Sequence, residues 1–200
     1  ERSRGLGDVY KRQVLYQALG SNTEAIKAYT EFTKMNKKHS DNLEATYSMA
    51  TIHRKAGQKS AAIDRYIEYV EGGGRDQEKV VESAYWVAEL SQSSRAITRA
   101  KEWKQKTLSI QKRFAPNRKG PGASYAAKFK LEDAMETFKE MKAINFPANP
   151  AKQKAAADRK IALLTKLSGE LVDVIKYDSA EEIVKALSVL GDANQNMAQA

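Results

Sequence analysis

Several residue types that build specialised sites are scarce in this sequence. Its 200 residues include no cysteine, only four prolines and only two histidines. Without cysteine there are no disulfide bonds and no thiolate metal ligands, although the compartment stays open because many periplasmic and cytosolic proteins lack cysteine alike. His39 and His53 lie fourteen positions apart in unrelated predicted elements, which is not a metal-ligand spacing. The sequence therefore predicts no metal and no cofactor.

Long apolar runs and catalytic motifs are also absent from the sequence. No stretch approaches the roughly 20 apolar residues that a membrane-spanning helix needs. The glycine run 72–74 is not followed by the Lys-Ser or Lys-Thr pair of a phosphate-binding loop. The paired acids Glu181 and Glu182 stand at a predicted helix start, where they favour the helix dipole without an acid-base role. We therefore predict that the chain is not an enzyme.

The composition that remains favours an all-α chain, and the clearest helical pattern lies at 43–70. Alanine is abundant and β-branched runs are short, which favours helix. Side chains that are apolar except for Arg54 recur there at steps of three and four, the period of one helical face, on both sides of a turn at Gly57. The positions are Leu43, Tyr47, Ala50 and Arg54, then Ala62, Ile63, Tyr66, Tyr69 and Val70. The pattern predicts two amphipathic helices that pack against each other.

This pair resembles the tetratricopeptide repeat (TPR), a helix-turn-helix unit of about 34 residues. The resemblance rests on Ala45, Tyr47, Met49, Ala50, Gly57, Ala62, Ile63 and Tyr66 in that order. Further alanines extend it, because Ala25, Ala62, Ala96 and Ala134 recur at spacings of 34 to 38 residues. The resemblance implies a right-handed TPR-like superhelical solenoid of antiparallel helix pairs. Proteins with such repeats generally bind peptide segments of other proteins.

Four repeats and a C-terminal hairpin follow from the pattern. The predicted repeats cover about 14–39, 43–74, 77–113 and 115–146, the last with a short helix at 123–128 and another at 131–144. A longer helical hairpin is expected at 150–200, and it is expected to be truncated. Its first helix runs from Pro150 to about Lys176, and its second begins at Ser179, where Ser179 and Glu182 match a capping box.

The first thirteen residues, ERSRGLGDVYKRQ, show no apolar period. They resemble a translated sequencing-adapter artefact, and a natural basic tail is the alternative. If they are foreign, a signal peptide could have been lost upstream, so their sequence does not argue against secretion. Together with a weak likeness of the region 167–190 to repeat proteins of bacterial cell envelopes, this leads us to expect a place in the bacterial periplasm or cell envelope.

The resemblance implies a partner groove lined by the first helix of each pair. Transferred to this sequence, the groove residues are Tyr47, Thr51, Arg54 and Lys55 in one repeat and Val81, Tyr85, Ala88 and Glu89 in the next. Aromatic and polar side chains at such a surface suit a protein or peptide segment. The alternative for Tyr47 and Tyr85 is packing between helices, since helical spacing does not separate the two roles.

Positive charge is concentrated in one stretch. Residues 95–130 hold eleven basic residues and one acidic residue, whereas the whole chain has a net charge of +9. On the helix expected from Ser94, a basic face is predicted from Arg95, Arg99, Lys106 and Arg113, opposite Ala96, Ala100, Trp103 and Ile110. An acidic protein, an anionic surface or a plain solvated face would each explain it, and no recognised nucleic-acid-binding module accompanies it.

The sequence thus predicts a protein-interaction scaffold, with a fragment of a larger multidomain protein, regulatory or enzymatic, as the alternative. Solenoid ends need polar caps for solubility, and the last helix presents Ile183, Leu187 and Leu190 with nothing after it to cover them. We therefore expect self-association through the terminal helices.

Overall fold

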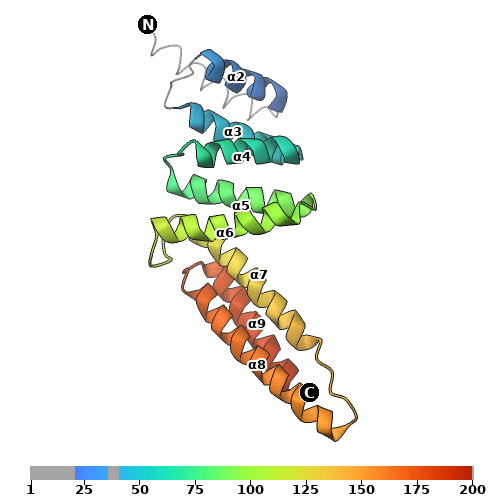
Figure 1. Cartoon of the computed structure of the whole chain (residues 1–200). Coiled ribbons are helices and arrows are strands. Elements are labelled where there is room, and N and C mark those ends of the chain that lie inside the picture. The colour runs from blue at the N-terminus through green and yellow to red at the C-terminus, as the bar shows by residue number, and fades with distance from the viewer. Residues whose placement is uncertain (1–20, 36–40, 200) are drawn as a thin grey trace. The chain divides into compact units, whose positions relative to one another are not determined.

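The computed structural model describes residues 21–35 and 41–199 of the chain. This described part contains eight helices and no strand, so the predicted all-α class is confirmed (Figure 1). The helices are α2 (Asn22–Met35), α3 (Asn42–Lys55), α4 (Lys59–Glu71), α5 (Gln77–Ser93), α6 (Ile97–Phe114), α7 (Ala123–Lys142), α8 (Pro150–Ile175) and α9 (Ala180–Ala198). The predicted foreign tail at 1–13 lies outside the described residues.

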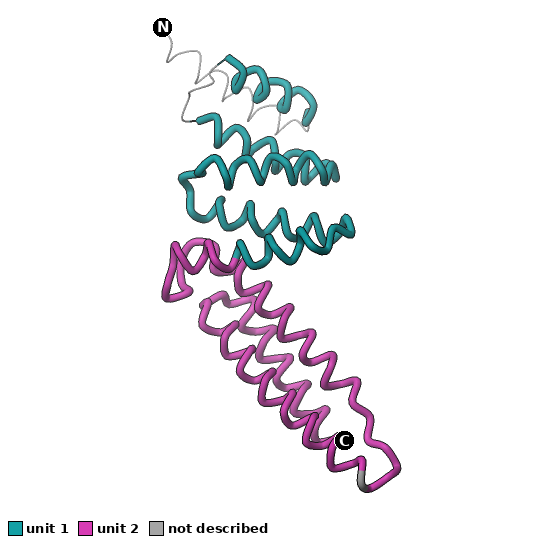
Figure 2. Tube along the Cα trace, viewed as in Figure 1, with its two compact units in different colours: residues 1–107 teal, residues 108–200 magenta. Residues whose placement is uncertain are grey.

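The chain divides into two compact units, coloured separately in Figure 2. Unit 1 is Glu1–Thr107 and unit 2 is Leu108–Ala200, so the division falls within α6. The sequence had instead suggested a division at the Pro-rich loop 146–150. The structure differs because α7, before that loop, packs against both α8 and α9 after it.

Unit 1 is built from helices that each pack on the next one in the chain: α2 on α3, α3 on α4, and α4 on α5. Its interior is filled by large side chains that the helical period places inward. Tyr66 and Tyr69 of α4 are fully buried, as is Val81 of α5, and Met49 of α3 is nearly so. Antiparallel helices joined by short turns at Gly57 and at 72–76 follow from this order.

The register of the repeat differs from the expected 34 residues. Ala25, Ala62 and Ala100 are each the fourth residue of their helix, and all three are buried. Ala100 follows Ala62 by 38 positions, whereas the expected equivalent, Ala96, lies just before α6. The turns agree with this register, because Arg95, which is 38 positions after Gly57, shares its left-handed backbone. The φ angles are +73° at Gly57 and +61° at Arg95.

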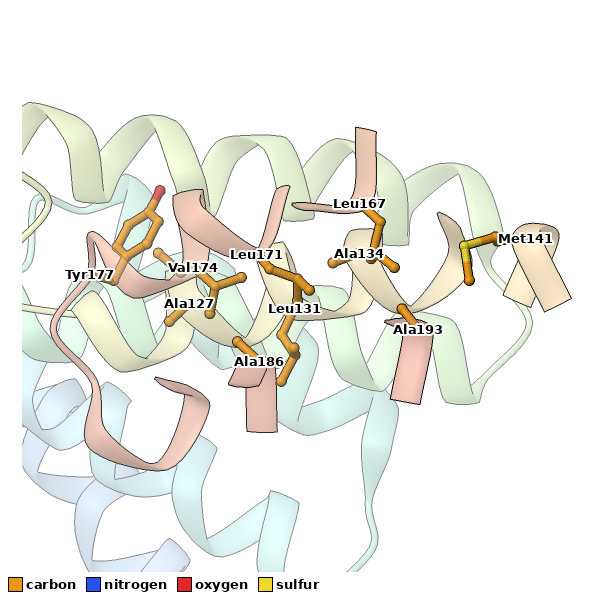
Figure 3. Close-up of a cluster of buried hydrophobic side chains, with 11 residues drawn as sticks. Ala127, Leu131, Ala134, Met141, Leu167, Leu171, Val174, Tyr177, Ala186 and Ala193 are labelled. Carbon is orange, nitrogen blue, oxygen red and sulfur yellow. The ribbon is translucent and has the colours of Figure 1, made fainter. Parts of the chain in front are cut away.

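Unit 2 is a bundle of three helices in which α7, α8 and α9 all contact one another. Figure 3 shows its core, where α7 contributes Leu131 and Met141 and α8 contributes Leu167 and Leu171. The two short helices expected within 123–144 are one continuous helix, α7. The segment contains no glycine or proline after Gly122 that would end a helix before Lys142, which explains the continuity.

The start of α9 also differs in detail from the expected capping box. The Ser179 hydroxyl is hydrogen-bonded to the Glu182 carboxylate, and the Ser179 side chain caps no backbone N–H group in the described chain. Glu182 is buried, with only 1% of its surface exposed, so the serine satisfies one of its carboxylate oxygens in place of water. The helix continues past Gly191 to Ala198.

None of the helices in residues 21–35 and 41–199 is both long enough and apolar enough to cross a membrane. In the same residues, histidine, aspartate and glutamate side chains form no group of three that could hold a metal ion.

Candidate partner-binding face

The structure places the predicted groove residues of α3 at the surface. Tyr47, Thr51 and Arg54 are partly exposed and Lys55 is exposed. Helical spacing puts Tyr47, Thr51 and Arg54 on one face of α3, because they are separated by steps of four and three residues. These three side chains therefore form one half of the candidate site.

The predicted residues of α5 need a correction, because three of the four are buried. Val81, Tyr85 and Ala88 are 0%, 8% and 3% exposed, and only Glu89 is partly exposed. They had been found by moving the α3 positions along the chain by the 34-residue family period. In this chain the facing positions of α3 and α5 are 35 residues apart, as the Tyr47–Glu82 and Glu44–Lys79 pairs show, so a transfer by 34 residues selected the inward-facing neighbours.

Other residues of α5 take their place. Lys79, Glu82 and Trp86 are partly exposed, follow one another at steps of three and four, and contact side chains of α3. We call the surface formed by the two helices the α3/α5 face. It consists of Glu44, Tyr47, Thr51 and Arg54 from α3 and Lys79, Glu82 and Trp86 from α5.

An ion pair joins one end of the α3/α5 face. Lys79 Nζ lies 2.5 Å from Glu44 Oε2, and Glu44 Oε1 accepts a hydrogen bond of 3.2 Å from the buried Tyr69 hydroxyl. The same ammonium group lies 5.2 Å from the centre of the Tyr47 ring. The Glu44 carboxylate is thus held by Tyr69 of α4 and by Lys79 of α5.

A shared carboxylate joins the middle of the face. The Tyr47 hydroxyl donates to Glu82 Oε2 at 2.5 Å, and Trp86 Nε1 donates to Glu82 Oε1 at 3.1 Å. Both oxygens of Glu82 therefore hold aromatic side chains in fixed orientations. Because an aromatic ring that is already ordered loses little freedom on binding, this arrangement suits recognition of a partner.

Arg54 forms the other end of the face. Its guanidinium carbon lies 3.9 Å from the centre of the Trp86 ring, a cation–π arrangement. Its Nε donates to the Tyr66 hydroxyl at 3.1 Å, and that hydroxyl lies 3.4 Å from Thr51 Oγ1. The buried tyrosine of α4 thereby orients a charged side chain on the surface.

Tyr66 and Tyr69 support the face from beneath. Burial raises the pKa of both hydroxyls above the ordinary value for tyrosine. Both groups therefore stay protonated near neutral pH and remain available for the hydrogen bonds described above. The ring of Tyr47 contacts both of them, with centre-to-centre distances of 6.2 Å to Tyr66 and 5.3 Å to Tyr69.

The predicted basic face is only partly assembled. Arg95 lies in the turn before α6, because the helix begins at Ile97 and not at Ser94 as expected. Arg99 and Arg113 are exposed on α6. Lys106 is only partly exposed, pairs with Glu71 Oε1 at 3.3 Å, and lies 3.9 Å from the centre of the Trp103 ring. The opposite, buried side contains Ala100, Trp103 and Ile110.

Comparison with known proteins gives the fold. No family model and no curated protein matches the sequence. Among solved structures, BtubC (BKLC) from P. vanneervenii is 14% identical over 97% of this chain and 80% of its own, with a TM-score of 0.52.

A putative kinesin light chain with nearly identical TPR-like repeats, from Podosopora anserina, is also similar. It is 17% identical over 100% of this chain and 89% of its own, with a TM-score of 0.53, and its Q17M form gives 15% and 0.54 over the same shares. The fold is TPR-like. The resemblance seen in the sequence is therefore confirmed at the level of a TPR-like helical solenoid, and the α3/α5 face belongs to the first helices of two successive TPR-like pairs.

Proposed function

We propose that this chain is a non-enzymatic interaction scaffold that binds a segment of another protein on its α3/α5 face. TPR-like folds typically mediate protein–protein binding and are typically non-enzymatic, which supports the class of activity. The location is supported by one observation above all. Trp86 and Tyr47, both partly exposed, are locked in place by the single carboxylate of Glu82.

This observation favours binding over simple packing. A surface aromatic pair with fixed rings offers apolar contact area at low entropic cost, which is how binding surfaces obtain affinity from few residues. The flanking groups Glu44, Lys79 and Arg54 add polar contacts around the rings. The α3/α5 face is a narrow row of side chains contributed by α3 and α5. An extended peptide is the occupant that suits a surface of this shape.

The first prediction tests this location. In a Tyr47→Ala, Trp86→Ala double variant, the affinity for a peptide selected on the unmodified chain should fall by about 30-fold or more, because such anchors are worth about 1–3 kcal/mol each. The loss should depend little on salt, since the lost contact is apolar. Fluorescence anisotropy across a salt series measures it.

Two control variants test whether the loss of affinity is specific to the α3/α5 face. Phe146→Ala removes an exposed aromatic side chain of unit 2 and should leave affinity unchanged. Arg95→Glu with Arg99→Glu tests the basic residues, and any loss there should shrink at high salt, because exposed charges are screened over about 8 Å at physiological ionic strength. Equal affinity for the unmodified chain and the Tyr47, Trp86 variant would remove the α3/α5 face as the binding site.

We also propose that two copies of the chain associate through unit 2. Val184 and Leu187 of α9 are 67% and 53% exposed, and Val172 of α8 is 52% exposed. One face of α8 and one face of α9 carry no charged residue. The face of α8 consists of positions 161, 164, 168, 172 and 175, and the face of α9 consists of positions 184, 187 and 191. Two copies of a chain with a net charge of +9 repel each other electrostatically. Faces without charged residues are where this repulsion is weakest.

The second prediction follows from that proposal. Leu187→Lys should shift the chain toward monomer in sedimentation, because it places a like charge on the apolar face of each copy. Ser188→Lys makes the same change of charge at the next, exposed position of α9 and should leave association unchanged. An unmodified chain that sediments as a monomer at high concentration would disprove the association.

A further inference from the structure

The guanidinium group of Arg54 is held in place while its outer edge remains without a partner. The guanidinium carbon lies over the Trp86 ring, 3.9 Å from its centre, and Nε donates to the Tyr66 hydroxyl. These contacts involve the flat side of the guanidinium group and its Nε nitrogen. In residues 21–35 and 41–199, no hydrogen bond or ion pair uses Nη1 or Nη2 of Arg54.

Arg54 differs from the arginines of the described chain that form ion pairs. Paired arginines elsewhere in the chain direct their terminal nitrogens to carboxylates, as Arg65 does to Glu68 and Arg118 does to Asp173. Arg54 instead has its orientation fixed by neutral groups, and its charge is not neutralised by an acidic side chain within 4 Å in the described part of the chain. The two Nη groups form a planar fork that matches a carboxylate in a bidentate geometry.

We propose that Arg54 receives a side-chain carboxylate of an acidic partner segment that lies along the α3/α5 face. This inference rests on the proposed function and names the chemistry of the partner. Trp86 and Tyr66 fix the guanidinium before the partner arrives, so little side-chain freedom is lost when the two hydrogen bonds form. The partner residue is therefore an aspartate or glutamate within an extended peptide.

The surroundings of Arg54 favour a carboxylate from an acidic segment. Lys55 is exposed beside it, and Lys59 at the start of α4 reaches the Ser93 carbonyl at 3.5 Å, which brings the end of α5 near the end of α3. The exposed Arg95 follows directly in the turn after α5. These positive charges would attract an acidic segment to this end of the face.

The same surroundings argue for a carboxylate over a phosphate. Glu82 is hydrogen-bonded to Trp86, on whose ring Arg54 lies, so a negative charge already stands close to the site. A doubly charged phosphate would be repelled more strongly by Glu82 than a singly charged carboxylate. A single guanidinium fork also offers two N–H groups in one plane, which a carboxylate satisfies completely.

The test starts from a phage-displayed library of random peptides selected on the intact 200-residue chain. Display through the peptide's C-terminus leaves no free terminal carboxylate, so any acid selected is a side chain. We expect the bound peptides to share an Asp or Glu. Changing that residue to Asn or Gln should weaken binding by about 10- to 100-fold, the range for a hydrogen bond to a charged group.

Variants of Arg54 tie the acid to this side chain. Arg54→Gln should cause the same loss for the acidic peptide and no further loss for its Asn or Gln form, which is the pattern of a direct pair in a double-mutant cycle. Arg54→Lys keeps the charge but removes the fork, so it should recover only part of the affinity. Arg65→Gln is the matched control, because Arg65 is a partly exposed arginine of α4 that pairs with Glu68, and this variant should bind as the unmodified chain does.

The outcomes separate this inference from the proposed function. Peptides that lose binding in the Tyr47, Trp86 variant, but share no acid or are insensitive to Arg54→Gln, would overturn the inference and leave the function standing. A phosphoserine peptide that binds more tightly than its glutamate form would overturn the choice of carboxylate. If no selected peptide depends on Tyr47 and Trp86, the proposed function itself fails. Circular dichroism of Arg54→Gln checks that the variant is folded, and Arg54→Lys carries the test if it is not.

Discussion

Truncation of Tyr66 to alanine is expected to lower the free energy of unfolding by about 3–5 kcal/mol, the range for removing a large aromatic side chain from a core. Tyr66 is fully buried in unit 1, and its hydroxyl contacts both Thr51 and Arg54. The substitution therefore creates a cavity and also leaves Arg54 without the partner of its Nε. Urea denaturation followed by circular dichroism measures the loss.

The matched variant Tyr66→Phe separates the ring from the hydroxyl. It keeps the packing and removes only the hydrogen bonds, so a smaller loss of about 0.5–1.5 kcal/mol is expected. Since Arg54 would lose one of its two fixed contacts, binding of an acidic peptide should also weaken modestly. If Tyr66→Phe proved as costly as Tyr66→Ala, the hydroxyl network and not ring packing would hold this part of unit 1 together.

The helices of unit 1 could be predicted because their apolar spacing is regular. The pair expected around Gly57 is observed as α3 and α4, with bounds within a few residues of those expected. The register between pairs could not be predicted as well. The turn after α5 is made by Arg95 in a left-handed conformation, where only glycine would have given a clear signal in the sequence.

Half of the candidate site could be predicted from the sequence. Tyr47, Thr51 and Arg54 were named from the sequence and lie on the α3/α5 face. Glu82 and Trp86 were missed because the α3 and α5 positions are 35 residues apart and not 34, and a shift of one residue turns a side chain by about 100° around the helix. One signal in the sequence could have found them. Glu82 and Trp86 are four residues apart on a predicted helix, a spacing at which two side chains can form a hydrogen bond.

The fold of unit 2 was obscured by the repeat template. That template requires a turn within 123–144, yet the segment contains no residue that ends a helix there, and α7 runs through it. Local sequence chemistry was the better guide at this point. The cell-envelope location, which no structural observation addresses, stays a prediction.

Replacing Leu167 with alanine is expected to lower the free energy of unfolding by about 2–5 kcal/mol, since leucine truncations in cores lose both transfer free energy and packing. Leu167 is fully buried in the core of the α7–α9 bundle, in the same cluster as Ala134 (Figure 3). Small neighbours such as Ala134 and Ala193 have no flexible side chain with which to fill the cavity, so the loss should fall in the upper part of that range.

Met135→Ala is the matched control in the same bundle. Met135 of α7 is 52% exposed and lies outside the faces proposed for association, so its truncation should change the free energy of unfolding by no more than about 0.5 kcal/mol. Amide hydrogen exchange should locate the effect of Leu167→Ala in α7, α8 and α9, because those three helices share the cluster that contains Leu167. Equal effects of the two substitutions would mean that Leu167 does not lie in a packed core, and the three-helix arrangement of unit 2 would then be wrong.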